Sequence, residues 1–183
     1  MRKKLLGCGC VGRFDRRAML AGIACIAIPR VSLAKAVISA RRPEDEDFMR
    51  LALEEAKKGD FPFGAIIVRE GKVAARGRNL GIQTNDPTAH GEMVAIRQFV
   101  SLHPAAELKG STIYTTGEPC PMCMSAILWC GFGRMVYAAS IEELSARIGQ
   151  IRMTSKSVAK AAPFRRIEIT GGVLTREALA LFK

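Results

Sequence analysis

Two short motifs contain the side chains of this sequence that are best suited to bind a metal ion. Cys120 and Cys123 lie three positions apart where a helix is expected to begin, so both sulfur atoms can face one point. The N-terminus of a helix stabilises the thiolate, which is the metal-binding form of cysteine. His90 stands at the expected start of another helix and supplies a third ligand. The three residues together predict a zinc site.

The number of protein ligands distinguishes a catalytic zinc site from a structural one. Three ligands leave the fourth tetrahedral position for water, whose pKa zinc lowers toward ~7. Glu92 lies two residues after His90, so on a helix it points away from the ligand face but begins the same turn. A carboxylate beside the metal can take a proton from water and deliver it to a leaving group. Glu92 is therefore the predicted catalytic proton carrier.

Each motif has a simpler interpretation when it is taken alone. Cys120 and Cys123 are also spaced as a thiol-redox pair, and a His-x-Glu sequence is usually two surface residues on a helix. A non-catalytic zinc protein is a third alternative, although a structural zinc site has no need of Glu92. The combination of both motifs, each at a helix start, is far more specific and favours the catalytic site.

Alternating strands and helices are expected to position these motifs. The pattern predicts helices at 43–58, 89–102, 119–130, 141–148 and 175–182, and strands at 63–68, 72–77, 111–116, 134–138 and 166–170. The continuous apolar run at 63–68 indicates a buried strand, and the Glu70-Gly71 pair after it indicates a hairpin turn. Strands that alternate with helices predict a layered α/β domain.

The motifs and their surroundings resemble the cytidine-deaminase-like superfamily of zinc enzymes. The resemblance is carried by Pro62-Phe63-Gly64-Ala65, Gly77-Arg78-Asn79, Asn85-Asp86-Pro87-Thr88-Ala89-His90, Glu118-Pro119-Cys120-Pro121-Met122-Cys123 and Ala126-Ile127-Leu128-Trp129. It extends from about residue 47 to 182 and is strongest to guanine deaminases and tRNA adenosine deaminases. It implies a three-layer α/β/α fold with a five-stranded mixed sheet between helices, a zinc cofactor and a homodimer.

The same resemblance implies an activity and three substrate contacts. In such enzymes water replaces an exocyclic amino group on a nucleobase-like ring, and ammonia is released. The resemblance implies that Asn79 hydrogen-bonds the ring and that Phe63 and Trp129 form walls of the pocket. The alternatives are a turn residue for Asn79 and core packing for the two aromatic side chains. The expected substrate is a nucleobase, nucleoside or related aminated heterocycle, with a guanine-like purine favoured and tRNA editing as the alternative.

Three departures from the family pattern bear on specificity. Gly91 stands where the family more often has Ala or Val, which should loosen the helix start without touching the ligands. Guanine deaminases carry an aromatic-acidic segment and a C-terminal aromatic contact, where this chain has Ile-Gly-Gln-Ile-Arg at 148–152 and ends Ala-Leu-Phe-Lys. The basic C-terminal extension typical of the tRNA enzymes is also missing. The sequence therefore predicts a small ring as substrate but leaves its identity open.

The excess positive charge lies mostly at the N-terminus. The net charge is +11, from 28 basic and 17 acidic residues. Residues 1–36 hold 8 of the basic and 1 of the acidic residues, a net +7, so 20 basic and 16 acidic residues leave +4 for the rest. A mildly basic body does not require a polyanionic partner, and no stable nucleic-acid partner is expected.

The first 36 residues have the order of an export signal. A basic segment containing Arg16-Arg17 precedes an apolar run at 20–29 and small-residue patterns that end at Ala34 and Ala36. The run is shorter than the about 20 residues of a membrane span, and the arginine pair resembles a twin-arginine signal. We expect a signal peptide at 1–36, a zinc-dependent deaminase domain without a membrane span at 37–183, and a periplasmic or secreted protein. The alternative is an unprocessed leader and a cytoplasmic protein.

Overall fold

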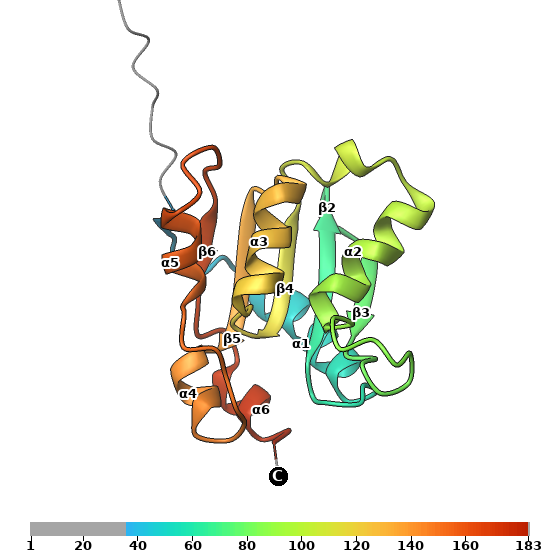
Figure 1. Ribbon diagram of the computed structural model, residues 1–183. Coiled ribbons are helices and arrows are strands. Elements are labelled where there is room, and N and C mark those ends of the chain that lie inside the picture. Colours follow the sequence, from blue (N-terminus) through green and yellow to red (C-terminus); the bar gives the residue numbers. More distant parts are fainter. Residues whose placement is uncertain (1–35, 183) are drawn as a thin grey trace, which may run out of the picture. The chain divides into compact units, whose positions relative to one another are not determined.

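A six-stranded mixed sheet organises residues 36–182, the part of the chain that the structure, a computed structural model, describes. The strands are β1 (Val37–Ile38), β2 (Gly64–Arg69), β3 (Lys72–Arg78), β4 (Thr112–Gly117), β5 (Arg134–Ala139) and β6 (Glu168–Thr170). Their order is β1-β6-β5-β4-β2-β3 (Figure 1). The strands β1, β6, β5 and β4 pair in parallel, whereas β2 is antiparallel to both β4 and β3. The predicted mixed sheet is confirmed.

The predicted number of five strands is wrong by one. The additional strand, β1, has two residues and pairs through Val37 and Ile38 with the edge strand β6. A segment this short has no hydrophobic periodicity, so the sequence pattern cannot reveal it.

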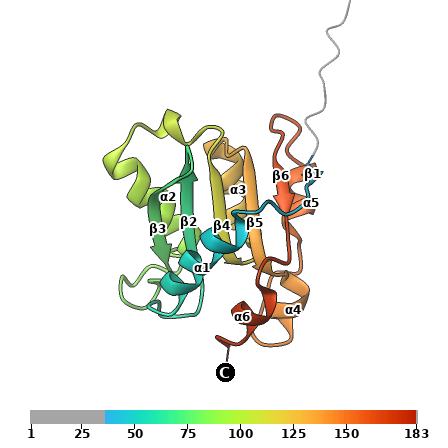
Figure 2. The ribbon, with the colours of Figure 1, turned by 180° about the vertical axis from the view of Figure 1, so that it is seen from behind.

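Helices cover both faces of the sheet and make three layers (Figures 1 and 2). One face carries α2 (Gly91–Leu102), α3 (Pro121–Cys130) and α5 (Ser155–Lys160), and the other carries α1 (Asp45–Ala56) and α6 (Thr175–Leu179). The short helix α4 (Ile141–Ser145) follows β5, and a 3-10 turn spans Ala105–Leu108. The three-layer α/β/α prediction is confirmed.

Alternate residues of the central strands build two separate cores. In β2, Ala65 and Ile67 pack on the side of α2 and α3, whereas Ile66 and Val68 pack on the side of α1. Successive side chains of a strand point to opposite faces, so a strand that is apolar throughout must be covered on both. This explains the continuous apolar run that marks β2 in the sequence.

The β2–β3 hairpin closes as its sequence predicts. Glu70 and Gly71 form a two-residue loop and both have positive φ, 51° and 71°, as a type I′ turn requires. The turn fixes the register of β3, whose last residue, Arg78, leads directly into the loop that precedes α2.

The start of α2 lies against the backbone of the strands, which gives a physical reason for the glycine at 91. A Cβ atom on Gly91 would lie 3.0 Å from the carbonyl oxygen of Phe63, and one on Gly77 would lie 2.1 Å from the carbonyl oxygen of Gly91. Glycine at both positions allows the helix start to sit directly on the sheet. The same contact places His90 and Glu92 at one end of β2 and β3.

The remaining differences from the predicted elements are at the C-terminal side. The helix predicted at 141–148 ends at Ser145, and α5 was not predicted because its six residues show no apolar stripe. The predicted signal peptide at 1–36 lies, except for Ala36, outside the described residues. Among the described helices, none has the length and apolar character needed to cross a membrane.

Candidate active site

Three potential metal ligands meet at the N-terminal ends of α2 and α3. His90 is the N-cap residue of α2, Cys120 is the N-cap residue of α3, and Cys123 lies in the first turn of α3. The Nδ1 atom of His90 lies 3.7 Å from Sγ of Cys120 and 3.5 Å from Sγ of Cys123. All three ligand atoms lie within 4.8 Å of one another. One imidazole nitrogen with two sulfur atoms is a donor set that zinc accepts, so these residues fit a zinc ion.

Local sequence explains why the two cysteines face the histidine. Pro121 occupies the first position of α3, where its missing N–H costs nothing and its fixed φ favours the helix. Cys120 therefore stays extended, with φ −61° and ψ 167°, and Cys123 lies one turn further along the same face. His90 is extended in the same way before α2.

The pKa values of the two thiols shift in opposite directions. The hydrogen bond with the Cys123 thiol lowers the pKa of Cys120 to about 4 against the opposing effect of burial. The same hydrogen bond, together with burial, raises the pKa of Cys123. The hydrogen bond to Cys120 raises the pKa of His90. Binding of a metal must displace the remaining protons, so metal affinity should fall as the pH falls.

Glu92 is a buried carboxyl group beside this cluster. It lies in the first turn of α2, is 8% exposed and is not one of the three converging ligands. Burial, with a contribution from the nearby Cys120 thiolate, raises its pKa to about 6. A carboxyl group that titrates near neutral pH can both accept and release a proton during a reaction.

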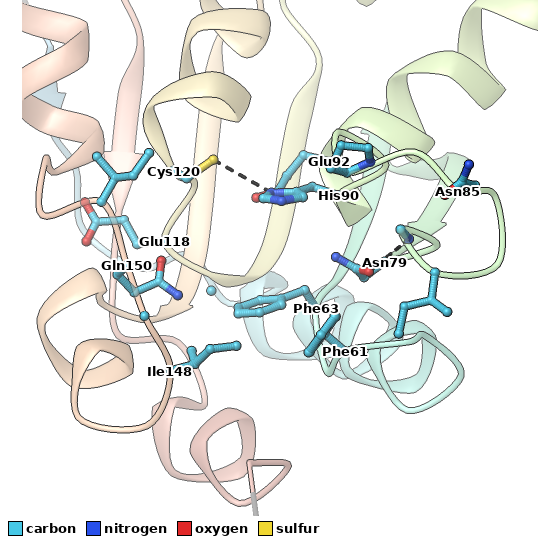
Figure 3. A pocket seen from close by; sticks show the side chains of 16 residues that line it. Phe61, Phe63, Asn79, Asn85, His90, Glu92, Glu118, Cys120, Ile148 and Gln150 are labelled. Carbon is cyan, nitrogen blue, oxygen red and sulfur yellow. Dashed lines mark hydrogen bonds between the residues drawn. The ribbon is translucent and has the colours of Figure 1, made fainter.

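A pocket of about 690 Å³ extends from the ligands to the surface (Figure 3). The ligand end contains His90, Glu92 and Cys120. One side is formed by Phe61, Phe63 and parts of the loop 79–87, and the opposite side by Glu118 and the segment 148–151. A volume of this size admits a bicyclic ring and a sugar.

Asn79 lines the pocket at the end of β3 and is 6% exposed. Its Oδ1 atom accepts a hydrogen bond of 3.2 Å from the backbone N–H of Gly81, so the amide nitrogen is left for a partner in the pocket (Figure 3). This bond makes Asn79 the first residue of a local turn, as the alternative interpretation expected, but without a left-handed backbone; Asn85 is the residue of this loop with positive φ. The turn role is therefore observed, and it leaves the amide nitrogen of Asn79 free of this bond.

Phe63 also lines the pocket, and its ring is held from two sides. The ring of Phe182 packs against it at a centroid distance of 5.2 Å with an interplanar angle of 66°. On the other side, a Cβ atom at Gly117 would lie 3.0 Å from the Phe63 ring, so only glycine leaves room for it. The wall position is therefore well defined.

The prediction that Trp129 is a pocket wall is wrong for the pocket of this chain. Trp129 is 72% exposed and stacks on Phe164 at a centroid distance of 4.9 Å. It lies nine residues after Cys120 on the same helix, which carries it about 13 Å along the axis at about 1.5 Å per residue. A residue at the C-terminal end of α3 therefore cannot reach a pocket at its N-terminal end.

Two further parts of the site were not predicted as such. Glu118 belongs to the motif around Cys120, and the structure shows that it is also buried and lines the pocket. Residues 148–151 were noted only as a departure from the family pattern, and they form the wall opposite Asn79 (Figure 3). His103, the other histidine, lies exposed at the opposite end of α2 from His90 and does not line the pocket.

Comparison with known proteins identifies relatives of two kinds. Residues 42–139 match the family model described as the cytidine and deoxycytidylate deaminase zinc-binding region. The chain is 44% identical over 117 residues to chloroplastic tRNA(adenine(34)) deaminase of Arabidopsis thaliana and 41% identical over 99 residues to guanine deaminase of Bacillus subtilis. It is 37% identical over 138 residues to tRNA-specific adenosine deaminase of Haemophilus influenzae.

The extent of these matches differs among the relatives. They cover 62%, 51% and 73% of this chain, and 9%, 64% and 78% of the three proteins respectively. The chain thus spans less than two thirds of the Arabidopsis and Bacillus proteins.

Solved structures give the same two kinds of relative. A structure from studies of tRNA:A34 deaminases is 29% identical, with a TM-score of 0.65, and the match covers 74% of this chain and 98% of that one. A structure of NE0047 in complex with 2,6-diaminopurine is 27% identical, with a TM-score of 0.65, and the match covers 80% of this chain and 81% of that one.

Proposed function

Because the chain belongs to the family of the cytidine and deoxycytidylate deaminase zinc-binding region, we propose that it hydrolyses the exocyclic amino group of a guanine-like purine and releases ammonia. The oxygen of water bonds to the ring carbon, the bond from that carbon to the exocyclic nitrogen breaks, and the amino group takes a proton from water and leaves as ammonia. The pocket residues divide this work among metal binding, proton transfer and ring orientation.

His90, Cys120 and Cys123 hold the metal ion. Their ligand atoms lie within 4.8 Å of one another, and their donor types suit zinc. A zinc ion there supplies the Lewis acidity that makes water nucleophilic near neutral pH. The thiol-redox alternative leaves both His90 and Glu92 without a role, so it is the weaker explanation of the site.

Glu92 moves the proton. It is buried at the ligand end of the pocket, and its pKa of about 6 suits a group that must be both base and acid near neutral pH. In the first half of the reaction its carboxylate takes a proton from water. In the second half it delivers that proton to the departing nitrogen.

Asn79 and Phe63 orient the ring. The amide nitrogen of Asn79 is available to donate a hydrogen bond, so it matches a carbonyl oxygen or a ring nitrogen of the substrate. Phe63, held by Phe182, offers a flat apolar surface to the ring. These two contacts direct the amino-bearing carbon toward Glu92 and the metal ligands.

The observation that favours a small substrate is the charge of the pocket wall. Among the described residues that line it, the charged side chains are Glu92 and Glu118, with His90 beside them, and none is lysine or arginine. Apart from the metal ligands, a phosphate group entering this pocket would meet carboxylates and neither a lysine nor an arginine. A free base or an unphosphorylated nucleoside therefore fits better than a nucleotide.

A second candidate is editing of adenosine in tRNA. It is favoured by the similarity to the Haemophilus tRNA-specific adenosine deaminase, which extends over 73% of this chain. RNA binding in that case would have to use basic residues outside the pocket, such as Lys156, Lys160, Arg165 and Arg166.

Ammonia release distinguishes the two candidates. The zinc-loaded chain would be assayed on guanine, adenine, cytosine, their nucleosides and a tRNA anticodon stem-loop, each at low and moderate salt. We expect guanine to be fastest and its rate to change little with salt. Log K for binding that depends on phosphates falls by about 0.7 per phosphate on single strands for each tenfold rise in salt. A stem-loop that is deaminated faster than every free base, and is inhibited by salt, would replace guanine with tRNA as the substrate.

We also propose that the protein is a homodimer, as its family resemblance implies. The α2–α3 end of the domain exposes a cluster of apolar side chains that a second copy can cover: Val100 (42% exposed), Trp129 (72%) and Phe164 (51%). Trp129 stacks on Phe164 and shares a hollow with Val100, so the three are contiguous. Sedimentation velocity of the native chain and of Trp129→Glu tests this, with a dimer expected for the native chain and a monomer for the variant.

A further inference from the structure

One wall of the pocket depends on a segment with few connections of its own. Residues 148–151 lie between α4 and α5 and line the pocket opposite Asn79. The backbone hydrogen bonds of this connection are local: Arg147 and Ile148 donate to Leu144, and Met153 donates to Ile151. The guanidinium of Arg147, beside the wall, also donates a hydrogen bond of 3.0 Å to the carbonyl oxygen of Phe182. Otherwise the position of the wall is set by the helices that flank its two ends, α4 before it and α5 after it.

A single carboxylate joins those two ends. Oε2 of Glu118 accepts a hydrogen bond of 3.0 Å from the backbone N–H of Ile141, the first residue of α4. Oε1 of Glu118 accepts bonds of 2.8 Å from the backbone N–H and 2.7 Å from the hydroxyl of Ser155, the first residue of α5. Glu118 is 7% exposed, and all three bonds are buried.

The backbone of Glu118 is also held by a hydrogen bond. Its N–H donates a hydrogen bond of 2.7 Å to the carbonyl oxygen of Ala139, at the end of β5. One residue, Pro119, separates it from the metal ligand Cys120, and proline restricts the backbone there. Glu118 thus gives the wall a short, stiff connection to the metal ligands.

We propose that Glu118 is a positioning residue that holds the wall formed by Ile148–Ile151 at a fixed distance from the metal ligands and so determines which ring the pocket accepts. The inference rests on the proposed deaminase function. Glu118 acts chiefly through the wall, because three of the about four acceptor sites of its carboxylate are already taken by Ile141 and Ser155. Gln150, whose amide lies on this wall facing the pocket, is the polar group whose placement depends on it (Figure 3).

Hydrogen exchange measured by mass spectrometry tests the clamp without any substrate. In Glu118→Gln, the amide nitrogen must face a backbone N–H, so at least one of the three bonds is lost. We expect amides within 146–154 to exchange about tenfold faster, the size expected for one hydrogen bond to a charged group. The matched control is Glu143→Gln, which makes the same carboxylate-to-amide change in the capping box of α4, where glutamine can still accept from Ser140, and leaves Glu118 in place. Equal exchange in Glu118→Gln and the native chain would overturn the proposal.

Steady-state kinetics test the consequence for the pocket. With the base that the native chain deaminates fastest, Glu118→Gln should raise KM about tenfold and change kcat by less than about threefold, because substrate placement is lost while proton transfer is kept. Zinc content should stay at the native value, and the relative kcat/KM among bases should change. Ser155→Ala removes one of the three bonds and should shift KM in the same direction by a smaller factor. An unchanged KM and base preference in both variants would contradict the proposal. A native chain that deaminates no base would contradict the proposed function instead, and the hydrogen-exchange result would then decide whether Glu118 holds the wall.

Discussion

Arg134 on β5 donates two parallel hydrogen bonds, of 2.6 and 2.7 Å, to the two carboxylate oxygens of Asp45 at the start of α1. Both side chains are buried, with exposed fractions of 3% and 0%. The Tyr114 hydroxyl donates a third bond to Asp45, and Thr170 accepts one from Arg134. This group joins α1 to the centre of the sheet on the face opposite the active-site helices.

Asp45→Asn should destabilise the fold in a pH-dependent way. Burial alone would raise the pKa of Asp45, but the hydrogen bonds from Arg134 and from the backbone of Arg42 outweigh it and hold this pKa below its usual value. The stabilisation is therefore present above the unfolded-state pKa of about 3.9 and is lost as the pH falls through the folded-state pKa. Removing one partner of a buried pair costs about 3–5 kcal/mol at neutral pH.

Urea unfolding of both chains at several pH values measures this difference. The gap between native chain and variant should be largest near pH 7 and should narrow at the acid end. Glu46→Gln, which affects an exposed pair with Arg50 on the same helix, should leave stability nearly unchanged. A gap that is constant across the pH range would show that the charge of Asp45 does not stabilise the fold.

Zinc should be lost when Cys120 or Cys123 is changed but kept when Cys130, on the same helix, is changed. Cys120→Ala and Cys123→Ala each remove one of three ligands and should abolish stoichiometric zinc. Cys130→Ala is the matched control, since Cys130 lies at the far end of α3 and packs against the core. Metal analysis of the purified chains should give about one zinc per chain for the native protein and Cys130→Ala. Full zinc occupancy in Cys120→Ala would contradict the ligand assignment.

Glu92→Gln should separate metal binding from catalysis. Glutamine keeps the shape of the side chain but cannot carry the proton, and general acid–base groups contribute ~10²–10⁴-fold to rate. We expect normal zinc content, normal stability and a loss of turnover of at least about this size. Near-native turnover in the zinc-loaded variant would remove Glu92 from the mechanism.

Export is predicted from the leader sequence alone. Changing both Arg16 and Arg17 to lysine should leave the precursor in the cytoplasm, since twin-arginine recognition requires the arginine pair. Immunoblots of cytoplasmic and exported fractions, with a resident protein of each as control, measure the distribution. Normal processing of the double variant would contradict the twin-arginine interpretation while leaving general secretion open.

The elements that the sequence predicted well are those with a strong local pattern. The apolar run of β2, the Glu70-Gly71 turn and the starts of α2 and α3 each depend on neighbouring residues only. The metal site was predictable for a related reason. Its ligands lie at helix starts, where local motifs fix the backbone, and the chemistry of His90, Cys120 and Cys123 restricts what the site can bind.

The features that the sequence did not predict depend on residues far apart in the chain. The role of Glu118 requires Ile141 and Ser155, which no local pattern connects with it. Trp129 was assigned to the pocket by resemblance, but its position is set by its distance along α3 from Cys120. The strand β1 and the helix α5 are too short to show periodicity; β1 is defined by its pairing with β6, and α5 by the cap that Thr154 provides.

The exposed stack of Trp129 on Phe164 gives the protein a spectroscopic reporter. Trp129 is the only tryptophan of the sequence, so the whole indole emission comes from one site. An indole that is 72% exposed should emit at long wavelength and be open to iodide quenching in the monomer. It does not line the pocket, so substrate and metal should leave its emission unchanged. Covering of this face by a second copy should shift the emission to shorter wavelength and protect it from the quencher, which would make dilution of the native chain followed by fluorescence a direct readout of its self-association.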